Sequence, residues 1–108
     1  MDLNAHIDRF ESRLSELEAA LGDPTVFSDQ KKSQELSREY NRVKGLVGLG
    51  RDYRSAGDEL KENLELLELE SNDSELAQMA QEEVKRLTVS QEAATLALRG
   101  GILPPDPT

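Results

Sequence analysis

The sequence predicts an all-α fold, an elongated antiparallel three-helix bundle or helical hairpin with coiled-coil-like packing. Three stretches carry apolar residues at steps of three or four, the spacing of one helical face. The 108 residues include two Phe, two Tyr and no Trp, so stripes of leucine and alanine must supply most of the buried surface. The longest stretch, about residues 30–70, contains no proline and would form a helix about 60 Å long.

The first stretch predicts a helix over residues 3–21 that lies along another helix, because its apolar steps alternate regularly between four and three. Asp2 or Asn4 can accept hydrogen bonds from the free amides at its start. Gly22 supplies the left-handed residue that commonly ends a helix, and Pro24 prevents its continuation. The stripe consists of Leu3, Ile7, Phe10, Leu14, Leu17 and Leu21.

The chain is expected to reverse direction over residues 22–29. Val26 and Phe27 are the apolar residues there, and we expect both to cover the end of the bundle. Ser28 or Asp29 can cap the long helix that follows.

The long helix carries an apolar stripe interrupted by three glycines. Gly45, Gly48 and Gly50 fall within six residues, and each costs a helix interior about 1 kcal/mol relative to alanine. Either the missing side chains let helix backbones approach closely where the first and last helices overlap, about residues 44–50, or the helix breaks at Gly48–Gly50 and the fold has four helices. The stripe consists of Leu36, Tyr40, Val43, Leu46, Leu49, Tyr53, Ala56, Leu60, Leu64 and Leu67.

A second reversal is predicted at residues 71–74, where Asn72 and Glu75 have the spacing of a capping box. The last helix then begins, and its stripe weakens after Thr88, so its last third is expected to pack loosely. The stripe consists of Leu76, Met79 or Ala80, Val84, Leu87, Gln91, Ala94 and Leu98.

Gly100 and Gly101 are expected to end the last helix, because prolines follow at 104, 105 and 107. The predicted organisation is a helical domain over residues 1–101 and an extended exit linker over residues 102–108.

Charge favours a protein partner. The formal net charge is -9, so the chain should repel nucleic acid and anionic membrane surfaces, and we expect it to bind neither directly. Residues 58–75 hold eight acids against one base, Lys61. They form either a solvated tip or a recognition surface for a basic partner. Elsewhere, Glu39 and Arg42 have the i,i+3 spacing of a helix-supporting pair.

The sequence offers no catalytic, cofactor-binding or metal-ligating constellation. It has no cysteine, one histidine, His6, and neither the HExxH zinc motif nor the GxxxxGK phosphate loop. We therefore expect that the chain is not an enzyme by itself. No apolar run reaches the 18 or so residues that cross a membrane, which favours a cytoplasmic location.

Three segments occur in an order and at separations found in a known family. They are Leu36-Ser37-Arg38-Glu39-Tyr40, the helix opening from Ser74 to Glu83, and the exit Leu103-Pro104-Pro105-Asp106-Pro107. With them, essentially all 108 residues resemble the N-terminal domain of a bacterial class-I peptide chain release factor, the type that reads UAA and UAG.

The resemblance implies an accessory domain that acts in translation termination, within protein biosynthesis, at stop codons on the ribosome. Its implied partners are proteins near the large-subunit stalk base and, through the intact factor, a termination GTPase. The family's stop-codon tripeptide and its catalytic Gly-Gly-Gln motif lie beyond Thr108, and Gly100-Gly101 is followed here by Ile102. Hydrolysis of peptidyl-tRNA would thus belong to the intact factor, and we expect the chain to be a piece of it. Glycines at 48, 50, 100 and 101 depart from the family's helix-forming residues.

A second hypothesis treats the chain as a free-standing acidic coiled-coil adaptor. It would then bind a basic protein partner or associate with itself, and its apolar stripes would be shared between chains.

Overall fold

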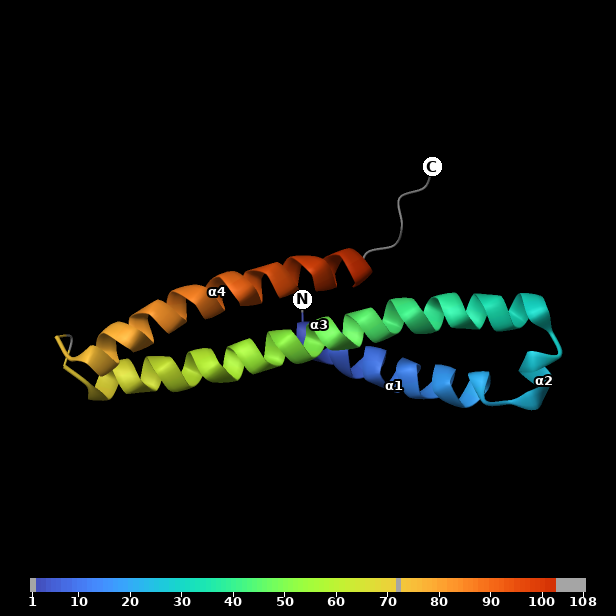
Figure 1. Cartoon of the computed structure of the whole chain (residues 1–108), viewed down its shortest axis with the longest axis horizontal. Coiled ribbons are helices and arrows are strands. Elements are labelled where there is room, and N and C mark those ends of the chain that lie inside the picture. The colour runs from blue at the N-terminus through green and yellow to red at the C-terminus, as the bar shows by residue number, and fades with distance from the viewer. Residues whose placement is uncertain (1, 72, 103–108) are drawn as a thin grey trace. The chain divides into compact units, whose positions relative to one another are not determined.

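The computed structural model describes residues 2–71 and 73–102, and every regular element among them is an α-helix. The helices are α1 (Leu3–Leu21), α2 (Pro24–Phe27), α3 (Gln30–Leu69) and α4 (Glu75–Ile102) (Figure 1). The predicted all-α class is confirmed. Contacts between Cα atoms divide the chain after Gly50 into two compact units, whose described parts are residues 2–50 and residues 51–71 with 73–102.

The long helix α3 contains no break at its glycines. Its 40 residues are helical throughout, so the predicted alternative of a break at Gly48–Gly50 is wrong. The fourth helix is instead α2, a single turn between α1 and α3. Helix α3 contributes its residues up to Gly50 to the first unit and the residues from Arg51 to the second.

The first unit is an antiparallel hairpin of α1 and the beginning of α3 (Figure 1). Its core consists of large apolar side chains, which belong to the predicted stripes of both helices except for Val47, a residue that the predicted stripe of the long helix did not include. Leu17, Val43 and Val47 are buried at its centre, and Phe10, Leu14, Leu36 and Tyr40 pack against them. Asp2 caps α1, because its Oδ1 accepts from the backbone N–H of Asn4 at 3.1 Å and of Ala5 at 3.3 Å. Gly22 ends α1 with φ -83°, so the predicted left-handed residue is absent there.

The connection between α1 and α3 matches the sequence predictions in part. Asp29 caps α3, because its Oδ1 accepts from the N–H of Lys32 at 3.1 Å. Asp23 caps α2 by accepting from the N–H of Thr25 at 2.9 Å. Val26 is buried as predicted, but Phe27 is 69% exposed, so only one of the two covers the end of the hairpin.

Gly50 marks a close contact within the first unit. A Cβ atom at this position would lie 2.7 Å from Cγ2 of Ile7, which is fully buried on α1. A Cβ at Gly45 or Gly48 would meet no atom of this unit within 4 Å. The predicted close approach therefore applies to Gly50 alone and involves an isoleucine side chain. The overlap of the first and last helices around residues 44–50 stays a prediction.

The second unit is an antiparallel hairpin of the end of α3 and α4, and it is built on small residues (Figure 1). The buried residues of α4 are Ala77, Ala80, Leu87, Ala94 and Leu98. Leu76, which the predicted stripe included, is 53% exposed, and Met79, which the prediction offered as an alternative to Ala80, is 63% exposed. Alanines at 77 and 80 take the buried face instead, which lets two helices lie close. The last third of α4 is not loose at its stripe positions, because Ala94 and Leu98 are 6% and 0% exposed.

The ends of α4 also differ from the predictions. Ser74 caps α4 by accepting from the N–H of Ala77 at 3.0 Å, whereas Asn72 of the predicted capping box lies outside the described residues. The helix continues through Gly100 and Gly101 and ends at Ile102. No described glycine has a positive φ, so neither glycine acts as a left-handed helix end. The rest of the predicted exit linker, residues 103–108, lies outside the described part.

Candidate functional site

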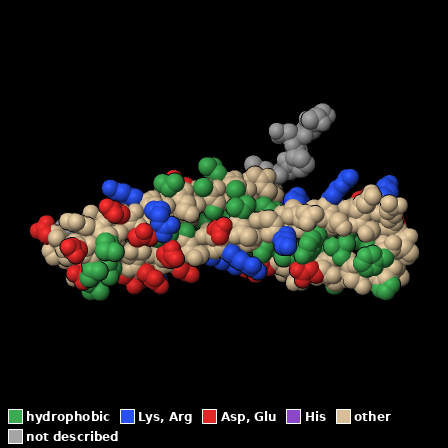
Figure 2. Space-filling view, in the orientation of Figure 1, with side chains coloured by type: hydrophobic (Ala, Val, Ile, Leu, Met, Phe, Trp, Pro, Cys, Tyr) green, Lys and Arg blue, Asp and Glu red, His purple; other side chains and the backbone are tan. Residues whose placement is uncertain are grey.

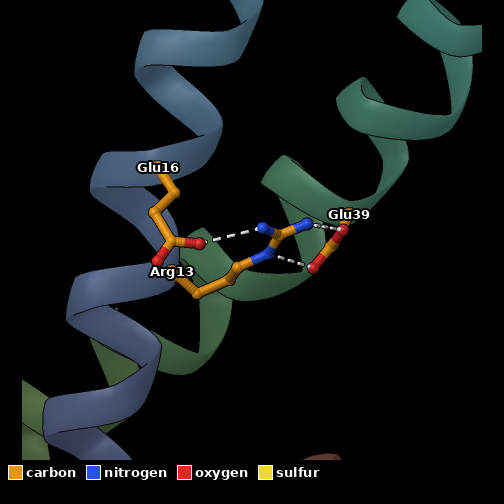
Figure 3. A network of polar contacts seen from close by, with 3 residues as sticks. All are labelled: Arg13, Glu16 and Glu39. Atoms are coloured by element: carbon orange, nitrogen blue, oxygen red, sulfur yellow. Dashed lines mark hydrogen bonds and ion pairs between the residues drawn. The ribbon is translucent and has the colours of Figure 1, made fainter.

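The strongest polar contact of the first unit joins its two helices. Arg13 on α1 donates through Nε and Nη2 to the two carboxylate oxygens of Glu39 on α3, each at 2.7 Å, and through Nη1 to Glu16 at 3.0 Å (Figure 3). These hydrogen bonds hold the pKa of the Glu39 carboxyl below its ordinary value and raise the pKa of Arg13. The side chain of Arg13 is 42% exposed and that of Glu39 32%. The contact fixes the register of the hairpin, and its groups are already engaged with one another.

Tyr40 and His6, two residues of the first unit that the sequence analysis named, each have a partner on their own helix. The Nζ atom of Lys44 lies 5.8 Å from the ring centre of Tyr40, which is within the range of a cation–π interaction. Tyr40 is partly buried. The Nδ1 atom of His6 lies 3.2 Å from Nη2 of Arg9, which is on the same helix. These contacts indicate structural roles for both side chains.

The acidic stretch of residues 58–75 lies on the end of α3, the following turn and the start of α4. Its described acids are exposed to solvent except Glu70, which is partly buried. Ser74 donates its backbone N–H to the carbonyl of Ser71 at 3.0 Å and so closes the turn. The predicted acidic tip is therefore an exposed feature of the second unit.

An open hollow of about 160 Å³ lies between α3 and α4 in the second unit. Arg86 donates to Glu83 at 2.7 Å beside it, which lowers the pKa of the Glu83 carboxyl and raises that of Arg86. The lining is mostly polar and comprises Asp52, Ser55, Ala56, Glu59, Arg86, Leu87 and Ser90.

Exposed apolar side chains accompany the acids near the α3–α4 turn. Leu69 on α3 is 87% exposed, and Leu76 and Met79 on α4 are more than half exposed. Figure 2 shows hydrophobic side chains gathered beside carboxylates at this end of the hairpin. The sequence analysis missed this surface because it placed Leu76 on the buried stripe and left open whether Met79 or Ala80 follows it there. The alternative spacing Ala77, Ala80, Val84, Leu87 was the signal that could have revealed it.

The structure brings together no catalytic set in its described part. Among the described residues, no three His, Cys, Asp or Glu side chains lie so that they could hold a metal ion. None of the described helices is both long and apolar enough to cross a membrane.

Comparison with known proteins gives a consistent result. The family model of the PCRF domain matches residues 10–108. Peptide chain release factor 1 of Thermus thermophilus is 39% identical over 101 residues, which is 94% of this chain and 27% of the relative. The protein of the same name from Clostridium botulinum (strain Hall) is 38% identical over 97 residues, which is 90% of this chain and 27% of the relative. Peptide chain release factor 1 of Pelobacter propionicus is 40% identical over 101 residues, which is 94% of this chain and 27% of the relative.

The chain thus spans about a quarter of the length of the curated relatives it matches. No solved structure matches it. The similarity confirms the resemblance to a release-factor domain that three sequence segments predicted, and it extends over nearly the whole chain. The family model alone covers well over half of the residues, so the chain belongs to the PCRF domain family.

Proposed function

We propose that this chain is the N-terminal accessory domain of a peptide chain release factor that acts in translation termination at stop codons on the ribosome. In this role it contacts proteins near the stalk base of the large subunit and, within the intact factor, a termination GTPase. It does not release peptide by itself, because decoding and hydrolysis belong to other parts of the intact factor.

The observation that carries the proposal is 39% identity over 94% of the chain to a peptide chain release factor 1. Charge supports the protein-facing role. At a formal net charge of -9, the chain is repelled by ribosomal RNA and attracted to basic proteins. The exposed acids of the second unit and the apolar side chains beside them offer a surface of the kind that protein partners use.

Co-sedimentation with bacterial large ribosomal subunits tests the proposal. The chain should sediment with intact subunits and lose that binding when the stalk-base proteins have been stripped from them. Adding the proteins back should restore it. Equal binding to intact and stripped subunits, or none to either, would contradict the proposed location.

A peptide-release assay tests the division of labour. Ribosomes programmed with UAA and carrying peptidyl-tRNA should release no peptide when the chain is added alone, and excess chain should slow release by an intact release factor. Release by the chain alone would refute the proposal. Sedimentation equilibrium provides a further check, since a concentration-dependent dimer without ribosome binding would favour the acidic adaptor.

A further inference from the structure

We propose that one face of the second hairpin, at its turn, is a docking surface for a basic amphipathic helix of a partner protein. The surface joins an apolar patch, Leu66, Leu69, Leu76 and Met79, here called the hairpin-end patch, to carboxylates on the same face. The inference deepens the proposed function. It rests on that function in one respect, which is that the partner is a protein of the termination apparatus.

The hairpin-end patch exposes large apolar side chains to solvent. Leu69, Leu76 and Met79 are 87%, 53% and 63% exposed, and Leu66 is partly buried. Single exposed leucines are ordinary, but a group of large apolar side chains rimmed by charges is typical of a protein-binding site. Methionine adds a flexible side chain that adapts to an incoming surface.

The register of the hairpin places these residues level with one another. Gln91 donates to the carbonyl of Tyr53, and Glu59 lines the same hollow as Arg86. Continuing this antiparallel register toward the turn sets Leu66 opposite Met79.

One helical turn further along, Leu69 lies opposite Leu76. The patch therefore consists of two facing pairs, one on each side of the groove between the helices.

Helical spacing puts the patch and the polar hollow on the same face. On α3, residues 52, 55, 59, 62, 66 and 69 follow at steps of three or four, and on α4 so do residues 76, 79, 83, 86 and 90. The first three and the last two of these positions line the hollow. The face thus begins apolar at the turn and becomes polar along the hairpin, which suits an elongated ligand.

The charge of this face selects a basic partner. The two stripes of this face carry four acids, Asp52, Glu59, Glu62 and Glu83. They carry one base, Arg86, which is paired with Glu83 at 2.7 Å. Carboxylates next to an apolar patch repel nucleic acid and anionic membranes, whereas they attract lysine and arginine side chains. A helix with an apolar stripe and a basic flank satisfies both halves of the surface.

A synthetic peptide of about 18 residues, with leucines on one helical face and lysines on the other, is the probe. Its binding to the chain is followed by amide chemical shifts, which should move at the end of α3, at the start of α4 and along the stripes near the hollow. A peptide with the same leucines and glutamates in place of the lysines should not bind. Raising the salt from about 50 mM to about 300 mM should weaken binding, because exposed charges are then screened.

Matched variants separate the proposed face from the rest of the hairpin. Leu69→Gln with Met79→Gln should weaken binding about tenfold or more, since apolar anchors dominate such interfaces. Val89→Gln with Leu96→Gln removes two apolar side chains of α4 with similar exposure, 67% and 69%, and should change binding less than about twofold. Glutamine favours helix, so all four substitutions should leave the fold intact.

A second pair of variants tests the charges. Glu59→Gln with Glu62→Gln should weaken binding and reduce its salt dependence. Glu65→Gln with Glu68→Gln alters the net charge equally, on other faces of α3, and should have the smaller effect. Equal losses in both pairs, or no peptide binding at all, would overturn the docking surface.

The same variants in the large-subunit sedimentation assay keep the two proposals apart. If the chain binds subunits and the patch variants bind equally well, the docking surface is refuted and the proposed function stands. If peptide binding follows the patch but the chain fails to bind subunits, the docking surface stands and the proposed function fails.

Discussion

The two hairpins of this chain share α3 but reach stability in different ways. The first packs large side chains, with Leu17, Val43 and Val47 buried at its centre and the ion pair of Arg13 and Glu39 across it. The second presents a mainly alanine face on α4 and leaves leucines exposed at its turn. A helix that buries small residues approaches its neighbour closely but removes less apolar surface from water. The contrast teaches that a hairpin packed on small residues can leave larger apolar side chains, here Leu69, Leu76 and Met79, exposed to solvent.

The largest effect is expected in the core of the first hairpin. Leu17→Ala removes a fully buried side chain and should lower the free energy of unfolding by about 2–5 kcal/mol. Thermal denaturation measures the loss, and hydrogen exchange should locate it in α1 and the beginning of α3. Leu69→Ala, at an 87% exposed site, is the control and should change the free energy by less than about 0.5 kcal/mol. Equal losses at both sites would contradict this assignment of the core.

The second hairpin should be more sensitive to added volume. Ala80 is 2% exposed, so Ala80→Leu forces new atoms into the close packing of α4 and should lower the free energy of unfolding by about 1–3 kcal/mol. Ala97→Leu places the same side chain at an exposed position of α4 and should be nearly neutral. A stable Ala80→Leu variant would show that this hairpin has room for larger residues and would remove the contrast.

Two glycines of α3 distinguish open surface from crowded contact. Gly48→Ala should stabilise the chain by about 0.5–1 kcal/mol, because alanine favours a helix interior and the site is open. Gly50→Ala gains the same propensity but places a Cβ 2.7 Å from Ile7 Cγ2, so we expect net destabilisation by about 1 kcal/mol. Urea denaturation of the two variants gives the comparison. A stabilised Gly50→Ala would mean that Ile7 moves aside without loss.

The smallest effect is expected from the ion pair, and it depends on pH. Because Arg13 holds the folded-state pKa of Glu39 below its ordinary 4.5, the pair stabilises the fold above that pH and loses its contribution as pH falls through the lowered pKa. Glu39→Gln should lower the melting temperature at pH 7 by at most about 4 °C. The difference from the parent chain should shrink as the pH falls through the lowered pKa of Glu39. Glu35→Gln, on the exposed part of α3, is the control, and a difference that grows in acid would contradict the pKa direction.

Much of the fold could be predicted because its signals are local. The steps of three and four in α1 gave its bounds, and the cap residues Asp2 and Asp29 needed only neighbouring amides. The glycines were harder, since Gly100 and Gly101 can either end a helix or continue one. Arg42 was predicted to pair with Glu39, but it is Arg13, 26 positions away, whose hydrogen bonds have the largest influence on the pKa of Glu39. No spacing rule within one helix could have found it.

The sequence by itself determined the three long helices, their order and the resemblance to release-factor domains. These follow from periodicity, composition and segment order, which require no knowledge of packing. Only the tertiary structure decided which side of α4 is buried. The start of α4 offers two overlapping stripes, one with the larger residues Leu76 and Met79 and one with the alanines at 77 and 80. The alanine stripe is the buried one, because small side chains let two helices pack closely. That choice leaves the hairpin-end patch exposed to solvent.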